Sequence, residues 1–299
     1  MMINRFFLFT MMGYLYIILS CVFFCMMTIF VKKSGDSLDT MQIVFVRGVF
    51  TLVFTIFILW KKNIYIWGSN KKLLGMRGLI GTIALFFVYE SLQRFSLAEA
   101  VAIQYLHPIF AAIFAMILIY EKIGKMLYVS MVLALLGTYY VLEFPFYNNV
   151  NIFEKIDILI AFAGSILTGL AYVLVRWLAK LDESPYVIMF YFPLFTVPIS
   201  FLFVYDKWIN PELDIWIYLI LIGICAQTAQ YFLTHGYKLL TASRASLTSY
   251  TQIPLSVVAG YYFFGDKISY NFLFGSLLIL LSVILMMRNM DQSNYNLKY

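Results

Sequence analysis

Ten stretches of mostly apolar residues follow one another along the chain, separated by short polar connections. A helix needs roughly 20 apolar residues to cross a bilayer, and a shorter stretch can be accommodated by local thinning. The pattern therefore predicts ten transmembrane helices and leaves no room for a soluble domain. The predicted helices span residues 13–31, 43–60, 78–93, 98–120, 126–142, 156–178, 186–204, 215–234, 243–264 and 272–287.

The composition favours a membrane over a globular core as the place for these stretches. Hydrophobic residues make up 63% of the chain and charged residues 12%, more apolar surface than one core of this length can bury. The net charge of +6 comes from Lys and Arg scattered at the ends of apolar stretches. We therefore expect the lipid bilayer, and no nucleic acid, as a partner.

Lys and Arg also predict how the chain is oriented. A cytoplasmic N-terminus would place 14 of them on the inner side and six on the outer side, with Arg47 inside a helix. Cytoplasmic flanks retain the excess of positive residues, so both termini are expected to be cytoplasmic. Frequent use of Ile, Lys, Asn, Tyr and Phe favours a bacterial source, and the expected location is the inner membrane.

Two stretches of the sequence share one pattern. Residues 96–122 and 242–267 each begin with small polar residues, carry a proline in the middle and end with an acid followed by lysine. The spacing agrees to within one residue, which indicates a duplicated unit. A further alignment pairs residues 39–44 with 183–188 and places Arg47 opposite Tyr191.

The duplication predicts two five-helix repeats, residues 13–142 and 156–287. Because each repeat crosses the membrane an odd number of times, the two must have opposite orientations, related by a pseudo-two-fold axis in the membrane plane. Inverted repeats are typical of transporters, in which exchanging the conformations of the halves opens a site to one side and then to the other. The predicted fold is an all-α integral membrane protein.

On these features the sequence resembles EamA-type members of the drug/metabolite transporter superfamily. The residues that carry the resemblance are 242–247, Pro254, 264–267 and 275–279, with 96–100, Pro108, Glu121-Lys122 and the Gly137 segment as first-half counterparts. The resemblance implies a secondary transporter that moves a small organic metabolite, such as an amino acid or a related compound, by alternating access. The alternative is uptake or exchange of S-adenosylmethionine or a nucleotide-like metabolite, because Arg47-Gly48 and Arg77-Gly78 resemble that uptake branch.

Polar residues within the fourth predicted helix are candidates for substrate binding, because intramembrane polar groups are costly unless paired or facing a cavity. Gln104 and His107 share one face of that helix. His107 suits substrate hydrogen bonding or proton coupling, although a histidine satisfied by a nearby carbonyl is equally consistent. Pro108 and Pro254 each free a carbonyl one turn back and act either as hinges or as static kinks.

The eighth and ninth helices supply further candidates. Gln227 and Gln230 share a face, which favours a cavity wall over hydrogen bonding between helices. On the ninth helix, Gln252 is too large for a close-packing position, and Tyr250 on a neighbouring face offers a stacking surface.

Charged residues form the last group of candidates. Arg47 lies about one turn inside the second helix, where it could snorkel outward, pair with Glu90 or bind a substrate carboxylate. Glu90 fits a solvated mouth position or a coupling carboxylate. The neighbouring Tyr89 could stack on a planar ligand.

These residues predict a site near the bilayer midplane between the third, fourth, eighth and ninth helices. The first, second, sixth and seventh helices would gate it, and the fifth and tenth would lie at the periphery, where a homodimer could form. The three cysteines lie inside apolar stretches without metal-ligand spacing. No phosphate-binding loop, HExxH or GxSxG motif occurs in the sequence. We therefore expect no catalysis, cofactor or metal; a membrane enzyme or non-transporting receptor is the alternative class.

Overall fold

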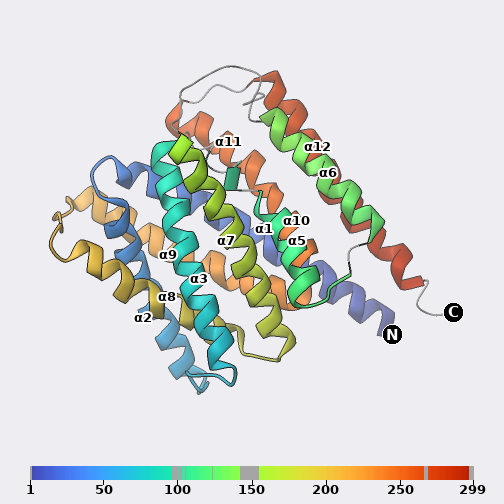
Figure 1. The fold of residues 1–299 in the computed structure, drawn as a ribbon, viewed down its shortest axis with the longest axis horizontal. Helices are drawn as coiled ribbons and strands as arrows, with labels where there is room; N and C mark the ends of the chain where they lie inside the picture. Colours follow the sequence, from blue (N-terminus) through green and yellow to red (C-terminus); the bar gives the residue numbers. More distant parts are fainter. Residues whose placement is uncertain are drawn as a thin grey trace.

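The computed structural model describes residues 2–95, 100, 103–104, 106–122, 124–141, 155–265 and 269–295. These residues form helices and short connections, with no strand among them (Figure 1). Three predicted features lie outside the described residues: the polar start of the fourth helix (96–99), the Asp266-Lys267 pair, and the connection 142–154.

The prediction of ten helical segments is confirmed, with the ninth built from three pieces. Six helices, α1, α2, α3, α7, α8 and α9, are long and apolar enough to cross a membrane, and α5, α6 and α12 contain shorter apolar helices. The first half contains α1 (Met2–Gly35), α2 (Thr40–Lys61), α3 (Lys71–Arg94), α5 (His107–Leu118) and α6 (Lys125–Val141). The second half contains α7 (Lys155–Lys180), α8 (Pro185–Val204), α9 (Leu213–Leu239), α10 (Ala242–Thr248), the 3₁₀ turn η1 (Ser249–Thr251), α11 (Gln252–Phe264) and α12 (Tyr270–Tyr295).

Helix packing has the two-fold relation that inverted repeats require. Helix α1 packs along α9, and α3 packs along α7, which is the same pairing with the halves exchanged. Helices α2 and α8 pair with each other, as do α6 and α12, so each lies against its own counterpart. The inverted arrangement of the two five-helix repeats is therefore confirmed, whereas their limits at 13–142 and 156–287 stay a prediction.

A pair of hydrogen bonds repeats this relation in detail. The Lys32 ammonium donates to the Phe95 carbonyl at 2.8 Å, joining α1 to the end of α3. In the register that pairs residue 39 with 183, Lys32 corresponds to Arg176, whose Nη1 donates to the Lys238 carbonyl at 3.1 Å near the end of α9. Equivalent cations thus bind equivalent helix ends in the two halves.

The regular α-helix is interrupted in the fourth and ninth segments, near the prolines at which the sequence predicted a kink or hinge. Helix α5 begins at His107 and has Pro108 in its first turn. The turn η1 separates α10 from α11, and Pro254 lies in the first turn of α11. Proline lacks an N–H group but needs no hydrogen bond in the first helical turn, so both prolines occupy favourable positions. The ninth segment stays helical from Ala242 to Phe264, with the 3₁₀ turn as its irregularity, and in the fourth segment Leu106 forms a turn directly before α5. The hinge role of the two prolines stays a prediction.

Helices α6 and α12 lie side by side at the edge of the bundle, as predicted for the fifth and tenth segments (Figure 1). A Cβ atom added at Gly137 of α6 would lie 2.6 Å from the Gly275 carbonyl oxygen of α12, so glycine permits this close approach. Dimerisation through this pair stays a prediction.

Candidate substrate cavity

A cavity of about 110 Å³ lies where the eight remaining segments meet. Both interrupted segments reach it, through Ala100, Gln104 and His107 from the fourth and Gln252 from the ninth. The predicted third, fourth, eighth and ninth segments all contribute, but α1, α2, α7 and α8, predicted to gate the site, line it as well. The residues with polar atoms in the lining are Thr28, Arg47, Arg77, Tyr89, Ser91, Gln104, His107, Thr168, Tyr172, Gln230 and Gln252.

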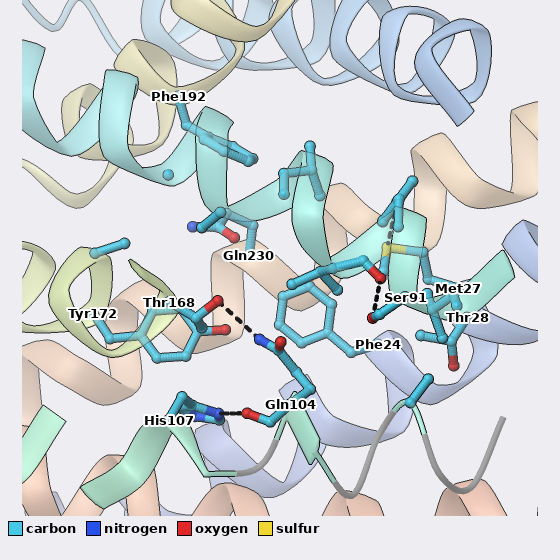
Figure 2. Close-up of a pocket in the computed structure, with 18 of the residues that line it drawn as sticks. Phe24, Met27, Thr28, Ser91, Gln104, His107, Thr168, Tyr172, Phe192 and Gln230 are labelled. Atoms are coloured by element: carbon cyan, nitrogen blue, oxygen red, sulfur yellow. Dashed lines mark hydrogen bonds between the residues drawn. The ribbon is translucent and has the colours of Figure 1, made fainter. Parts of the chain in front are cut away.

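His107 joins the two interrupted segments. Its Nδ1 lies 3.0 Å from the Gln104 carbonyl oxygen (Figure 2), and because a carbonyl can only accept, Nδ1 carries a proton. The other ring nitrogen, Nε2, lies 3.4 Å from the Ser249 hydroxyl of η1. The ring also meets Tyr172 of α7 edge to face, with 5.2 Å between ring centres. The Gln104 carbonyl therefore satisfies one ring nitrogen of His107, and the residue also lines the cavity.

Two glutamine side chains leave hydrogen-bonding atoms open towards the cavity. Gln104 donates through Nε2 to the Thr168 hydroxyl at 2.8 Å, whereas its buried Oε1 has no partner among the described residues. Gln230 of α9 has a buried Nε2 that likewise lacks a partner there. Figure 2 shows both amides among the lining side chains. These two amides thus supply one hydrogen-bond acceptor and one donor that have no partner among the described residues.

Arg47 lies in the cavity wall and neither snorkels nor pairs with Glu90. Its side chain is buried with 3% of the residue exposed, because α2 is covered at this level by α3 and α8. Its guanidinium carbon lies 5.5 Å from the ring centres of both Tyr89 and Phe192. The Nε and Nη1 atoms have no hydrogen-bond partner within the described part of the chain. Arg47 therefore occupies neither of these two predicted positions, and binding of a substrate carboxylate stays a prediction for this residue.

Glu90 is instead part of a surface ion-pair group. Arg94 at the end of α3 contacts Glu90 at 3.1 Å and Asp157 at the start of α7 at 2.7 Å. The side chains are 27% exposed for Glu90 and 40% exposed for Arg94. Glu90 therefore occupies the predicted solvated position and is absent from the described cavity lining.

Arg77 is a lining residue that was predicted to be a cytoplasmic flank of the third helix. Helix α3 begins at Lys71, so Arg77 lies six residues inside it, about 9 Å along the axis. It is 2% exposed, and its Nε and Nη1 atoms also lack partners among the described residues. The predicted span 78–93 was too short to cross a bilayer, and this shortfall was the signal that the helix extends through Arg77.

Gly81 makes room for the Arg77 side chain. A Cβ atom added at Gly81, one turn further along α3, would overlap Arg77 Nη1. The absent side chain lets the guanidinium fold along its own helix towards Phe192, whose ring centre lies 4.9 Å from the Arg77 Cζ atom. Both arginines therefore approach the same aromatic ring.

Two further predicted site residues, like Glu90, lie away from the cavity lining. Gln227 donates to the Thr55 hydroxyl of α2 at 3.0 Å, which is the interhelical hydrogen bond that the sequence left as the alternative. Tyr250 is fully buried in η1 and is not among the lining residues. The described lining includes the other predicted residues, Gln104, His107, Gln230, Gln252, Tyr89 and Arg47. Substrate binding by any of the predicted residues stays a prediction.

Thr168, Tyr172 and Phe192 are lining residues that sequence analysis missed. Threonine occurs in many membrane helices as a packing residue, and aromatic residues make up 19% of this chain. Neither residue type distinguishes a cavity wall from an ordinary helix contact. Knowledge of the helix packing was therefore needed to find these three.

The cavity lining has an uneven charge. It contains two arginines and, within the described residues, no aspartate or glutamate. Both arginines come from the first half: Arg47 corresponds to Tyr191 in the second half, and the same register places Arg77 opposite Leu221. The site therefore departs from the two-fold symmetry of the scaffold.

Comparison with known proteins gives a family match over most of the chain. The sequence model of the EamA-like transporter family matches residues 11–143 and 155–288. An uncharacterized transporter of Helicobacter pylori is 25% identical, covering 90% of this chain and 92% of its own. The pseudopaline exporter CntI of Pseudomonas aeruginosa is 22% identical, covering 92% of this chain and 96% of its own.

A solved crystal structure has the same fold. It superposes with a TM-score of 0.73 and covers 93% of this chain and 95% of its own, at 18% sequence identity. This likeness concerns the fold alone.

Proposed function

Because the chain belongs to the EamA-like transporter family, a family of the drug/metabolite transporter superfamily, we propose that it moves a small organic metabolite through the described cavity by alternating access. The observation that carries this proposal is the position of the cavity, which is lined from both inverted halves at the two helix interruptions. Interrupted helices at the interface of inverted repeats are common binding sites in secondary transporters.

We propose a role for each group of lining residues. Gln104, Gln230 and Gln252 form hydrogen bonds with the substrate, Tyr89 provides an aromatic surface, and Arg47 binds a negatively charged group. His107 holds the interruptions of the fourth and ninth segments together through Gln104 and Ser249. Pro108 and Pro254 would act as hinges at these interruptions. Gln227, Tyr250 and Glu90, away from the lining, would act only through packing or at the mouth.

Proton coupling through His107 is the form of energy coupling that we propose to test. The Ser249 hydroxyl has one proton and donates it to the Ser246 carbonyl at 2.5 Å. A protonated His107 could then donate from Nε2 to the Ser249 oxygen, whereas the neutral ring would present a lone pair to it. In proteoliposomes, His107→Gln should abolish pH-gradient-driven accumulation and leave exchange intact. Gradient-independent transport by the unmodified protein would instead establish exchange without proton coupling.

Among the substrates considered from sequence, an amino acid or related compound fits the lining better than S-adenosylmethionine does. S-adenosylmethionine carries a sulfonium and an ammonium group, which the two arginines would repel in a lining that has no carboxylate among the described residues. The cell location proposed for the carrier is the bacterial inner membrane, with both termini cytoplasmic.

Alternating access can be tested with one cysteine in the cavity. Ser91 lines the cavity, and its hydroxyl bonds only within its own helical turn, to the Val88 carbonyl at 2.7 Å. Ser91→Cys would be made after Cys21, Cys25 and Cys225 are replaced by alanine. A membrane-impermeant thiol reagent should label this cysteine when added to either face of oriented vesicles, and substrate should change the ratio of the two rates.

The matched control is Ser130→Cys, on a fully buried position of α6 outside the cavity. This cysteine should remain unlabelled from both faces. Labelling of Ser91→Cys from one face only, with and without substrate, would contradict alternating access and favour a receptor or enzyme pocket.

A further inference from the structure

Arg47 and Arg77 are two buried cations whose charge no described side chain neutralises. Each has two guanidinium nitrogens, Nε and Nη1, without a hydrogen-bond partner in the described residues. Both line the cavity, and the described lining contains no acid to pair with them. A charged group inside a membrane protein is costly unless it is paired or solvated, and such groups commonly mark substrate pathways.

Ring contacts supply only part of what these cations need. The Arg47 and Arg77 guanidinium carbons lie 5.5 and 4.9 Å from the centre of the Phe192 ring. A cation over an aromatic face is attracted to the ring, but this contact uses none of the hydrogen-bonding capacity of the Nε and Nη1 atoms. Within the described residues no side chain fills this capacity, which leaves it available to a ligand in the cavity.

We propose that the transported metabolite is an organic anion with two negatively charged oxygen groups, in the simplest case a dicarboxylate. Arg47 would hold one group and Arg77 the other. The proposal names the substrate class of the carrier described above and so rests on that proposed function. Guanidinium groups suit it because their planar donor sets match carboxylate and phosphate oxygens.

The spacing of the two arginines fits a short molecule. Both guanidinium carbons approach one ring, so they are at most about 10 Å apart, the sum of the two distances to Phe192. A short-chain anion with charged groups at both ends can bridge this interval once each group lies at hydrogen-bonding distance from its arginine. Phe192 between or beside the guanidinium groups would contact the carbon backbone of the ligand.

Two open amide atoms specify the rest of the ligand. Gln104 Oε1 needs a donor and Gln230 Nε2 needs an acceptor. A hydroxyl or amino group on the metabolite would satisfy the first, and any ligand oxygen the second. Hydroxy- and amino-dicarboxylates therefore match the cavity, whereas a cation would face two arginines without a counter-ion.

Binding to the purified protein tests the substrate class directly. Thermal-shift measurements would test malate, aspartate and glutamate. Asparagine and glutamine, in which a neutral amide replaces the side-chain carboxylate, are the matched analogues of aspartate and glutamate. Glycerol 3-phosphate would distinguish phosphate from carboxylate as the oxyanion, and S-adenosylmethionine and lysine would serve as cations. At least one compound with two anionic groups should stabilise the protein, and its singly amidated analogue should not.

Charge-removing variants locate the site. Arg47→Gln and Arg77→Gln should each weaken binding of the stabilising anion by roughly 30-fold or more. Arg77→Lys, which keeps the charge but loses the planar donor set, should have an intermediate effect. Arg94→Gln is the matched control, because this arginine lies in the surface ion pair, and it should bind like the unmodified protein.

Counterflow in proteoliposomes separates this inference from the carrier function. Exchange of the bound anion supports both proposals, and binding without exchange would overturn only the carrier function. Exchange of a neutral or cationic solute that Arg47→Gln and Arg77→Gln leave unaffected would overturn only the anion proposal. The anion proposal is also overturned if every compound in the anionic series fails to stabilise the protein at millimolar concentration.

Discussion

Arginines in two regions of this protein have opposite surroundings. Arg176 of α7 contacts Glu121 at 2.9 Å and donates to the Tyr237 and Lys238 carbonyls. The other Glu121 oxygen accepts from the Ala242 amide at the start of α10. Arg47 and Arg77, in contrast, line the cavity and have Nε and Nη1 atoms without a hydrogen-bond partner among the described residues.

The difference separates a structural charge from a ligand-binding charge. The Arg176 group joins the end of the fourth segment, α7, and the junction of α9 and α10, so its charges are satisfied by the fold itself. The cavity arginines instead lie against aromatic rings, and the absence of a side chain at Gly81 makes room for Arg77. Arg47 and Arg77 are 3% and 2% exposed, whereas the Arg176 side chain is 17% exposed, so the more deeply buried arginines are the ones with fewer hydrogen bonds.

The largest effect on stability should come from the ion pair between Arg176 and Glu121, whose charges the fold itself satisfies. Glu121→Gln leaves the Arg176 charge without a counter-ion, and breaking a buried pair in this way costs about 3–5 kcal/mol. Partial exposure of these side chains, 8% and 17%, favours the lower end of that range. Denaturant unfolding in detergent would measure the change. Glu90→Gln, in the exposed pair with Arg94, is the control and should cost less than about 1 kcal/mol.

A steric change next to Arg77 should disturb the cavity without removing any charge. Gly81→Ala would push the Arg77 guanidinium away from its position, and forced shifts of this kind cost about 1–3 kcal/mol. We expect anion affinity to fall by about tenfold or more. The matched control on the same helix is Gly75→Ala, where an added Cβ would be 3.8 Å from its nearest neighbour, Phe195. Equal affinity losses in the two variants would argue against a role for Gly81 in placing Arg77.

The smallest effects should distinguish the two glutamines of α9. Gln227→Leu removes the hydrogen bond to Thr55, so it should lower the free energy of unfolding by about 0.6–1 kcal/mol and leave substrate affinity unchanged. Gln230→Leu removes an open donor in the cavity, so it should weaken substrate binding severalfold without loss of stability. Titrations and unfolding curves of both variants would test this, and a loss of affinity in Gln227→Leu alone would reverse the assignment.

The sequence predicted the scaffold well because its signals are long and repeated. Apolar length located all ten segments, and the duplicated pattern gave the inverted halves. The form of the irregularities near Pro108 and Pro254 was not predicted, because proline is also tolerated within regular membrane helices when neighbours satisfy the freed groups. Proline therefore marked the right places but could not distinguish a kink from the start of a new helix.

The cavity was only partly predictable, because small rotations decide which side chains reach it. Gln227 and Gln230 are about 60° apart around the axis of α9, close enough to share a predicted face, yet one meets Thr55 and the other the cavity. The 3₁₀ turn η1 changes the helical rotation just where Tyr250 lies. Arg77 was missed for a different reason, since Lys and Arg near predicted helix ends are usually explained by orientation.

The most direct measurement is the unfolding midpoint of Arg77→Met in detergent, with and without the stabilising anion. If Arg77 is a ligand-binding charge that the fold leaves unpaired, the empty variant should unfold at the same temperature as the unmodified protein or higher. Only the unmodified protein should then gain stability from the anion. A large loss of stability in the empty variant, comparable to that of Glu121→Gln, would contradict the account and make Arg77 a structural residue.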